Sequence, residues 1–554
     1  MYHIDLTNMH SLTRNRKVPR KHAYDCPPGS ESTAEDNLNR GQQQNLSFIA
    51  RRLSLDPSGY AVLATALNIL MFLLPTFITA SAIRPPAVGR PRRKTLFLDG
   101  VRGIAAIMVT TYHHMNRTSY SYGRPYYLGP YGPGEDAQDF TSLAQLPIIR
   151  VFCSGGSGVA VFFVISGYLL SVRPVQIIRQ VEREADPSKR HSLLGTLVET
   201  LFSSIIRRGV RLFLPCIIVT FIFECMDAIG VFHVHFEHAA PGLWGYVLHF
   251  WHILDTLFAA IFNVDGGKVD VLRQLWTVPT EFACSMALFV VIIGISRLST
   301  RGRVICLTGL MGFAFYYDHN GLFAYIGGIF VAEIEEAFAD FRIVVSKDAD
   351  FRCHHQAKQQ HELLSTTAEK GGESMRGDQR PIPAPFDMGA TWLALFYKVF
   401  WNTLLLVSLY IFGWPFLRLE REPLLFWADS VLGRERSRSL AAFAFVNCLF
   451  RLPWLQNMFQ KPFAIYLGTI SFSIYCVHFS LIIALEKGVS HHVGNIFGTR
   501  RLGHANRFFA NTYEAALMLC AVIWVGDLFW RLGDIPTIKL ARWIEQRSKV
   551  ECSS

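Results

Sequence analysis

The sequence predicts an all-α fold, a polytopic transmembrane helical bundle of about 10–11 membrane helices. Of its 554 residues, 51% are hydrophobic and only 18% are charged, and the mean hydropathy is +0.24. A soluble globular chain carries about a quarter charged residues. Apolar runs long enough to cross roughly 30 Å of hydrocarbon recur along the chain. These observations together predict an integral, multi-pass membrane protein.

The net charge of +11 does not indicate a nucleic-acid partner. Lys and Arg concentrate in loops beside apolar segments, which is the positive-inside pattern of membrane proteins. The eleven cysteines are scattered, mostly inside apolar runs, and form no CxxC pair. We therefore predict a lipid bilayer as a partner, no nucleic acid, no disulfide framework and no metal site.

Composition divides the chain into four regions. In chain order they are a disordered polar and basic extension (1–57), an extra apolar segment with a basic linker (58–94), a membrane domain (95–536) that a flexible loop interrupts (339–392), and an amphipathic, basic tail (537–554).

Apolar runs of spanning length predict the membrane helices in order. They lie at 97–115, 158–173, 201–225, 276–296, 304–318, 321–338, 394–415, 437–450, 464–486 and 513–531. The stretch 247–263 carries two histidines and an aspartate, which favours an interfacial or re-entrant helix. Segment 59–83 contains Pro75 and has basic flanks on both sides, so it either spans or dips in and returns.

Loop charges orient this ten-span arrangement. The basic loops face the cytosol, and the loops 116–154 and 226–275 face the lumen or the exterior. The predicted location is an endomembrane, such as the endoplasmic reticulum, or the plasma membrane.

The stretch FLDGVRGIAAIMVTTYHHM (97–115) carries charge within an apolar helix. Arg102 and His113 are eleven residues apart, close to three helical turns, so both lie on one face, about 16 Å apart along the axis. A snorkelling arginine and a hydrogen-bonded core histidine are the structural alternative. Ionisable groups inside a membrane are costly, so the pair favours a functional role.

Four further motifs carry polar groups. Ser166 and Gly167 lie in GGSGVAVFFVISGYLL, where small residues most often serve packing. Arg208 and Arg211 share a helix face in IIRRGVRLFLP, which suits either a cytosolic helix start or a bound phosphate. Glu281 in QLWTVPTEF needs a histidine or arginine of a neighbouring helix as partner.

The last of these motifs is YLGTISFSIYCVHFSLII (466–483), with His478 in mid-span. A buried histidine is ordinarily a satisfied core residue, so alone it is weak evidence of function.

In this order the motifs resemble those of the acyltransferase 3 family of multi-pass membrane O-acyltransferases, in its fungal-type branch. The resemblance runs through FLDGVRGIAAIMV with its histidine, GVAVFFVISGYLL, RRGVRLFLP, LWTVPTEF and ISFSIYCVHFSLI, over roughly Phe97 to Pro536. Thr280-Glu281 leaves one carboxylate where bacterial members often have two.

The resemblance implies transfer of an acyl group, usually acetyl, from acyl-CoA to a hydroxyl of a small molecule such as a secondary metabolite, or of a glycan or lipid. Acyl-CoA is then a cosubstrate, and no cofactor is permanently bound. The family's Arg-x10-His pair corresponds to Arg102 and His113, its Arg-x-x-Arg to Arg208 and Arg211, and its Ser-Gly-Phe to Ser166-Gly167-Tyr168.

His113 is the implied general base or transient acyl carrier, with Arg102 and Glu281 as the other catalytic candidates. Candidate donor- or substrate-binding residues are Arg208, Arg211, Ser166, Gly167, Tyr168, Trp276 and His478. A proton-coupled transporter or flippase that uses the same intramembrane Arg, His and Glu groups is the alternative function.

Overall fold

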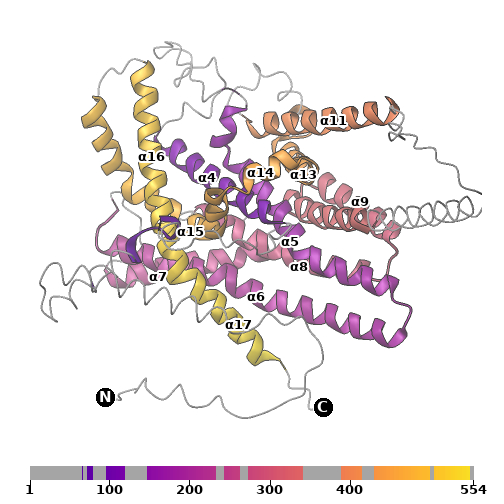
Figure 1. Cartoon of the computed structure of the whole chain (residues 1–554). Helices are drawn as coiled ribbons and strands as arrows, with labels where there is room; N and C mark the ends of the chain where they lie inside the picture. The colour runs from indigo at the N-terminus through magenta and orange to yellow at the C-terminus, as the bar shows by residue number, and fades with distance from the viewer. Residues whose placement is uncertain are drawn as a thin grey trace, which may run out of the picture. The chain divides into compact units, whose positions relative to one another are not determined.

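The structure, a computed structural model, describes residues 65, 72–78, 95–118, 146, 148–232, 242–262, 273–340, 388–414, 429–498 and 504–549. These residues are mostly helical and contain no strand, which confirms the all-α prediction (Figure 1). The helices are α4 (Leu96–Thr118), α5 (Gly155–Arg183), α6 (Pro187–Ala228), α7 (Leu243–Ala259), α8 (Thr277–Ile295), α9 (Thr300–Tyr316), a helix over 320–340, α11 (Met388–Phe412), α13 (Arg434–Arg451), α14 (Pro453–Phe459), α15 (Pro462–Phe497), α16 (His504–Phe529) and α17 (Ile535–Ser548).

Each of the ten predicted spans falls on a helix. Six stretches of the described chain are long and apolar enough to cross a membrane, as a multi-pass protein requires. They are Gly155–Arg183, Pro187–Ala228, Gln274–Ile295, Leu395–Phe412, Pro462–Phe497 and Phe509–Ser548.

The prediction of a loop between the spans 158–173 and 201–225 is wrong, because this stretch is helical except for residues 184–186. α5 continues to Arg183 and α6 begins at Pro187. The Asp186 carboxylate accepts a hydrogen bond from the backbone N–H of Ser188, and Pro187 occupies the first helical turn. Both features start a helix. The two helices thus form a long hairpin.

The stretch 247–263 lies largely in α7, a 17-residue helix that a 3-10 turn at Ala260–Phe262 extends. Leu243, Trp244 and Trp251 of α7 are 78%, 64% and 68% exposed, so an apolar face of this helix is open to its surroundings. Of segment 59–83, only residue 65 and residues 72–78 are described, and they belong to a separate unit. The predicted extension and most of the loop 339–392 lie outside the described residues.

Helices α4 and α15 run parallel and cross closely at glycines. A Cβ on Gly103 would come within 2.5 Å of the Gly468 backbone nitrogen, and one on Gly468 would clash with the Asp99 backbone carbonyl. Further along both helices, Arg117 donates a hydrogen bond from Nη2 to Oε1 of Glu486 over 2.6 Å. This crossing fixes the face of α4 that α15 covers.

We expect Gly468→Ala to lower stability by about 1–3 kcal/mol, because the added methyl group forces the two backbones apart. Gly488→Ala is the matched control on the same helix, since a Cβ there meets no atom within 4 Å. The measurement is the thermal unfolding midpoint in detergent. Equal midpoints for the two variants would contradict the close crossing.

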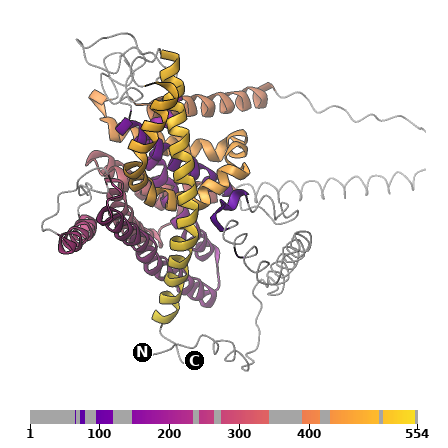
Figure 2. The same cartoon turned by 90° about the vertical axis from the view of Figure 1, so that its left-hand side faces the viewer.

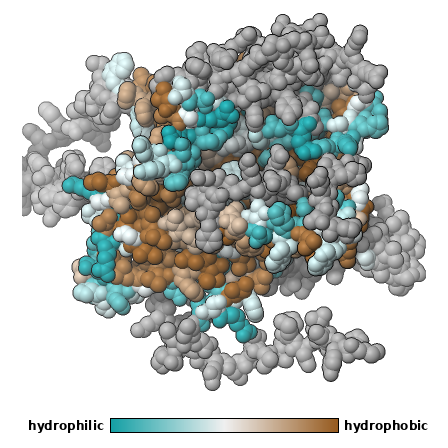
Figure 3. Space-filling view, turned by 180° about the vertical axis from the view of Figure 1, so that it is seen from behind, coloured by the Kyte–Doolittle hydropathy of each residue, from teal (hydrophilic) through white to brown (hydrophobic). Residues whose placement is uncertain are grey.

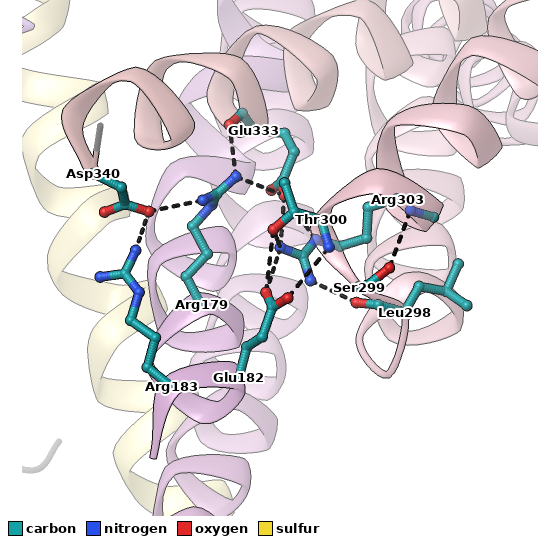
Figure 4. Close-up of polar contacts among 10 residues, drawn as sticks. Arg179, Glu182, Arg183, Leu298, Ser299, Thr300, Arg303, Glu333 and Asp340 are labelled. Atoms are coloured by element: carbon teal, nitrogen blue, oxygen red, sulfur yellow. Dashed lines mark hydrogen bonds and ion pairs between the residues drawn. The ribbon is translucent and has the colours of Figure 1, made fainter. Parts of the chain in front are cut away.

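An ion-pair network joins α5, α9 and the helix over 320–340 (Figure 4). Oε1 of Glu333 accepts from Arg179 Nη2 at 2.9 Å and from Arg303 Nε at 2.7 Å. Arg303 also donates to Glu182 at 3.0 Å, and Arg179 to Asp340 at 2.8 Å. Arg303 and Glu333 are each 1% exposed, so the network lies inside the protein.

Helix α17 follows α16 after a π-helical turn, Trp530–Asp534, and lies against α6 (Figures 1 and 2). Its buried residues Thr537, Ala541 and Glu545 repeat every four residues and form the face toward its neighbours. The predicted amphipathic tail therefore includes a helix that packs on the membrane domain.

Apolar side chains gather over a broad area of one face, bordered by hydrophilic ones (Figure 3). On α8 and α9, Val290, Ile305 and Phe313 are 69%, 72% and 54% exposed. Such exposure is costly in water and natural in lipid.

Candidate active site

His113 lies near the C-terminal end of α4 and faces α15. Its ring centre is 5.2 Å from that of His478 and 5.3 Å from that of Phe479. The residue is partly exposed, whereas neighbouring His114 is buried. Because α4 is continuous from Leu96 to Thr118, Arg102 lies on the same face about 16 Å away, as predicted. The imidazole is thus directed into the bundle.

His478 is fully buried within α15. Its Nδ1 is 2.8 Å from the backbone carbonyl oxygen of Tyr475. The Tyr475 hydroxyl lies 2.7 Å from Oγ1 of Thr277 and also donates a hydrogen bond to the carbonyl of Gln274. This part of α15 is therefore tied to the start of α8.

Glu281 pairs with an arginine of the neighbouring helix, one of the two partner types that the sequence requires. Nη2 of Arg208 donates to Oε1 of Glu281 at 2.6 Å and to the Tyr325 hydroxyl at 3.1 Å. The Arg208 Nε donates to Oγ of Ser285 at 3.0 Å, and the Ser166 hydroxyl donates to Glu281 at 3.3 Å. Four helices meet at this pair, so Arg208 is committed to protein partners.

Arg211 differs from Arg208, although the two share one face of α6. Within the described residues Arg211 makes no hydrogen bond or salt bridge, while Asp534, Arg208 and Arg102 act on it electrostatically. Among the described residues Arg102 has one long salt bridge, 3.9 Å to Asp99, and its guanidinium lies 6.0 Å from the ring centre of Phe162. Arg102 and Arg211 therefore retain hydrogen-bonding capacity for an anion.

Two buried polar residues near these groups were missed in the sequence. Asp534 is 5% exposed in the π-helical turn, and its field acts on Arg211. Gln274 is 1% exposed, and neither polar atom of its side chain has a hydrogen-bond partner among the described residues. For Asp534, the only signal in the sequence was its position two residues before Pro536 in GDIP. For Gln274 there was none, because the motif that it opens, QLWTVPTEF, drew attention only to its carboxylate.

The remaining candidates lie apart from these contacts. Tyr168 is buried in the apolar core, with its ring centre 4.9 Å from that of Phe450. A Cβ on Gly167 would clash with the backbone carbonyl of Tyr325, so this glycine permits a close helix crossing. Trp276 is 39% exposed in the turn before α8. Among the described residues no group of three or more His, Cys, Asp and Glu could hold a metal ion.

Comparisons with known proteins support the prediction of an acyltransferase. Residues 95–339 match the family model described as "Acyltransferase domain". The chain is 27% identical to O-acetyltransferase PaAT-1 of Phomopsis amygdali over 489 residues, which are 82% of this chain and 85% of that protein.

Two further relatives are more distant. Acyltransferase R4 of a Phoma species is 23% identical over 83% of this chain and 98% of its own length. Acyltransferase clz18 of Cochliobolus lunatus is 22% identical over 80% of this chain and 94% of its own length. No solved structure matches the chain.

Proposed function

We propose that this multi-pass membrane protein is a member of the acyltransferase 3 family and that it transfers an acyl group from acyl-CoA to a hydroxyl of a small molecule. Acetyl is the simplest donor group, and one relative is named an O-acetyltransferase. The observation that carries the proposal is the shared face of α4. This face carries Arg102 and, toward its other end, His113, which is directed into the bundle. Arg211 of α6, which has no hydrogen bond or salt bridge within the described residues, interacts electrostatically with Arg102.

Arg102 and Arg211 are the proposed binding groups for the phosphates of acyl-CoA. Guanidinium groups bind phosphate oxygens in a bidentate manner, and neither arginine is saturated by protein partners in the described chain. An extended pantetheine arm is comparable in length to the axial distance of about 16 Å between Arg102 and His113. The thioester of a donor held by the arginines would therefore reach the imidazole.

His113 is the proposed general base. As the acceptor oxygen attacks the thioester carbonyl carbon, His113 takes the hydroxyl proton, the C–S bond breaks, and the imidazolium returns the proton to the CoA thiolate. Alternatively, a His113 nitrogen attacks the thioester first and carries the acyl group to the acceptor. Both routes end in an ester and free CoA.

Arg208, Glu281 and Ser166 have a supporting role in this proposal. Arg208 binds Glu281, Ser285 and Tyr325, and the Ser166 hydroxyl of α5 donates to the same Glu281. Together these contacts hold α5, α6, α8 and the helix over 320–340 at fixed separations. Charge-assisted hydrogen bonds of this kind are stronger than hydrogen bonds between neutral groups. They keep α6 in the position from which Arg211 serves the donor.

The test is acyl transfer by membranes that contain the protein, given labelled acetyl-CoA and a panel of hydroxylated small molecules, glycans and lipids. Acceptor-dependent release of free CoA together with label in the acceptor supports the enzyme. Transport of an acceptor across sealed vesicles without label transfer would indicate the transporter instead. Label on His113 in the absence of acceptor would identify the covalent route.

We expect Arg211→Met to raise KM for acyl-CoA roughly 10- to 100-fold, since it removes hydrogen bonds to a charged group. The value of kcat at saturating donor should stay close to that of the wild type. Arg207→Met is the matched control, because Arg207 is paired with Glu545 at 3.3 Å. An equal effect of the two variants on KM would argue against a phosphate contact at Arg211.

A further inference from the structure

The two nitrogens of His478 are in different environments. Nδ1 faces the backbone of its own helix, 2.8 Å from the Tyr475 carbonyl and 3.3 Å from the Ile474 carbonyl. A carbonyl oxygen can only accept a hydrogen bond, so Nδ1 carries the proton. In the neutral ring Nε2 is then a lone-pair acceptor, and it is directed away from the backbone of α15.

This acceptor has no partner, although it is buried. His478 is 0% exposed, and Nε2 makes no hydrogen bond within the part of the chain that the structure describes. Buried polar atoms are nearly always hydrogen-bonded, and an exception in a native protein calls for an explanation such as a catalytic role or a bound group. A histidine kept only for packing leaves this atom without a purpose.

The neighbour at the right distance is His113. The ring centres are 5.2 Å apart with the planes inclined by 42°. Two imidazoles joined by an N–H···N hydrogen bond, with nitrogens about 2.9 Å apart, have centres about 5 Å apart. A turn of the His113 ring therefore suffices to direct one of its N–H groups at the free lone pair, and catalytic hydrogen bonds commonly tighten only when substrate binds.

The elements around the pair are fixed. Helices α4 and α15 cross at Gly103 and Gly468, which sets the depth of both histidines. The carbonyl that determines the tautomer belongs to Tyr475, whose hydroxyl is bound to Thr277 and to the Gln274 backbone at the start of α8. The orientation of His478 thus depends on two helices rather than on its own rotamer alone.

We propose that His478 is a positioning residue for acyl transfer: its Nε2 accepts a hydrogen bond from His113 and thereby directs the other, unprotonated nitrogen of His113 at the acceptor hydroxyl. The inference rests on the proposed function and deepens it. A chain of hydrogen bonds runs from the Tyr475 carbonyl through His478 and His113 to the substrate, and it selects one tautomer of the base.

Three substitutions at one position separate the two nitrogens. His478→Gln keeps an acceptor near the site of Nε2, whereas His478→Met has a similar length and fills the space without one. His478→Asn keeps a donor for the Tyr475 carbonyl but has no atom near the site of Nε2. The measurements are kcat, KM for acetyl-CoA and the thermal unfolding midpoint of the full chain in detergent.

We expect His478→Met and His478→Asn to lower kcat about 10²-fold, the usual cost of a misplaced reacting group, with KM for acetyl-CoA unchanged. His478→Gln should recover at least a tenth of the wild-type kcat. For stability we expect the opposite order, Met above Gln, because a buried amide with an unpaired group destabilises the protein relative to methionine. A packing role predicts the same order, Met above Gln, in both measurements.

The outcomes are distinguishable from failure of the proposed function. If the wild type transfers no label to any acceptor, the acyltransferase assignment fails and the inference fails with it. If the wild type is active and the Met or Asn variant keeps its kcat, or Gln is no better than Met, the positioning role alone is overturned. Should the Met variant not fold, the Asn and Gln variants decide the question in the same way.

Discussion

The His113→Ala variant is expected to lower kcat for acyl transfer by about 10³-fold, because general bases contribute between 10² and 10⁴. KM for acyl-CoA should change little, since the proposed phosphate contact at Arg102 lies about 16 Å away along α4. Release of free CoA from labelled acetyl-CoA, in the presence of the best acceptor of the panel, is the measurement.

The adjacent histidine supplies the control. His114 is 2% exposed and buried beside Met115, whereas His113 is partly exposed and faces His478. His114→Gln should therefore affect folding yield more than kcat of the folded protein. The opposite pattern, with activity lost at 114 and kept at 113, would transfer the role of base to His114.

The apolar runs predicted where helices lie but not how far they extend. Residues 174–200 are interrupted by charged side chains, chiefly Arg and Glu, so they contain no apolar run of membrane length. Apart from 184–186, they nevertheless form the end of α5 and the beginning of α6. Where a helix extends beyond its apolar segment into polar sequence, hydropathy does not reveal it. Only a helix-start signal such as Asp186-Pro187-Ser188 does. A prediction from hydropathy alone therefore places a loop there.

Partner choice could not be predicted from spacing. Arg208 and Arg211 are equivalent in the sequence, since both lie on one face of α6, and only the approach of α8 and the helix over 320–340 commits Arg208 to Glu281 and Tyr325. Ser166 and Tyr168 form one motif in the sequence. Successive helical residues differ by about 100° around the axis, so these two side chains point about 200° apart. Ser166 accordingly contacts Glu281, and Tyr168 lies in the core against Phe450.

Glu333→Ala is expected to destabilise the protein by about 3–5 kcal/mol, because removal of one partner leaves buried charges uncompensated. Both Arg303 and Arg179 donate to the same oxygen of Glu333, and neither guanidinium can lose its charge (Figure 4). Glu333→Gln keeps an acceptor at that position and should cost less than Ala. The thermal unfolding midpoint in detergent measures the order of the three proteins.

Glu182→Ala is the matched control, since Glu182 bonds the same arginine at 3.0 Å but is 39% exposed, and exposed ion pairs contribute about 0–1 kcal/mol. A loss of stability as large as that of Glu333→Ala would mean that the number of ion pairs, rather than their burial, determines stability here.

The variants also separate stability from catalysis. Glu333 lies eight residues beyond Tyr325 on one helix, about 12 Å along the axis, so the folded fraction of Glu333→Gln should keep its kcat. A fall in kcat without a fall in the midpoint would instead mean that this network sets the position of Tyr325, and through it of Arg208.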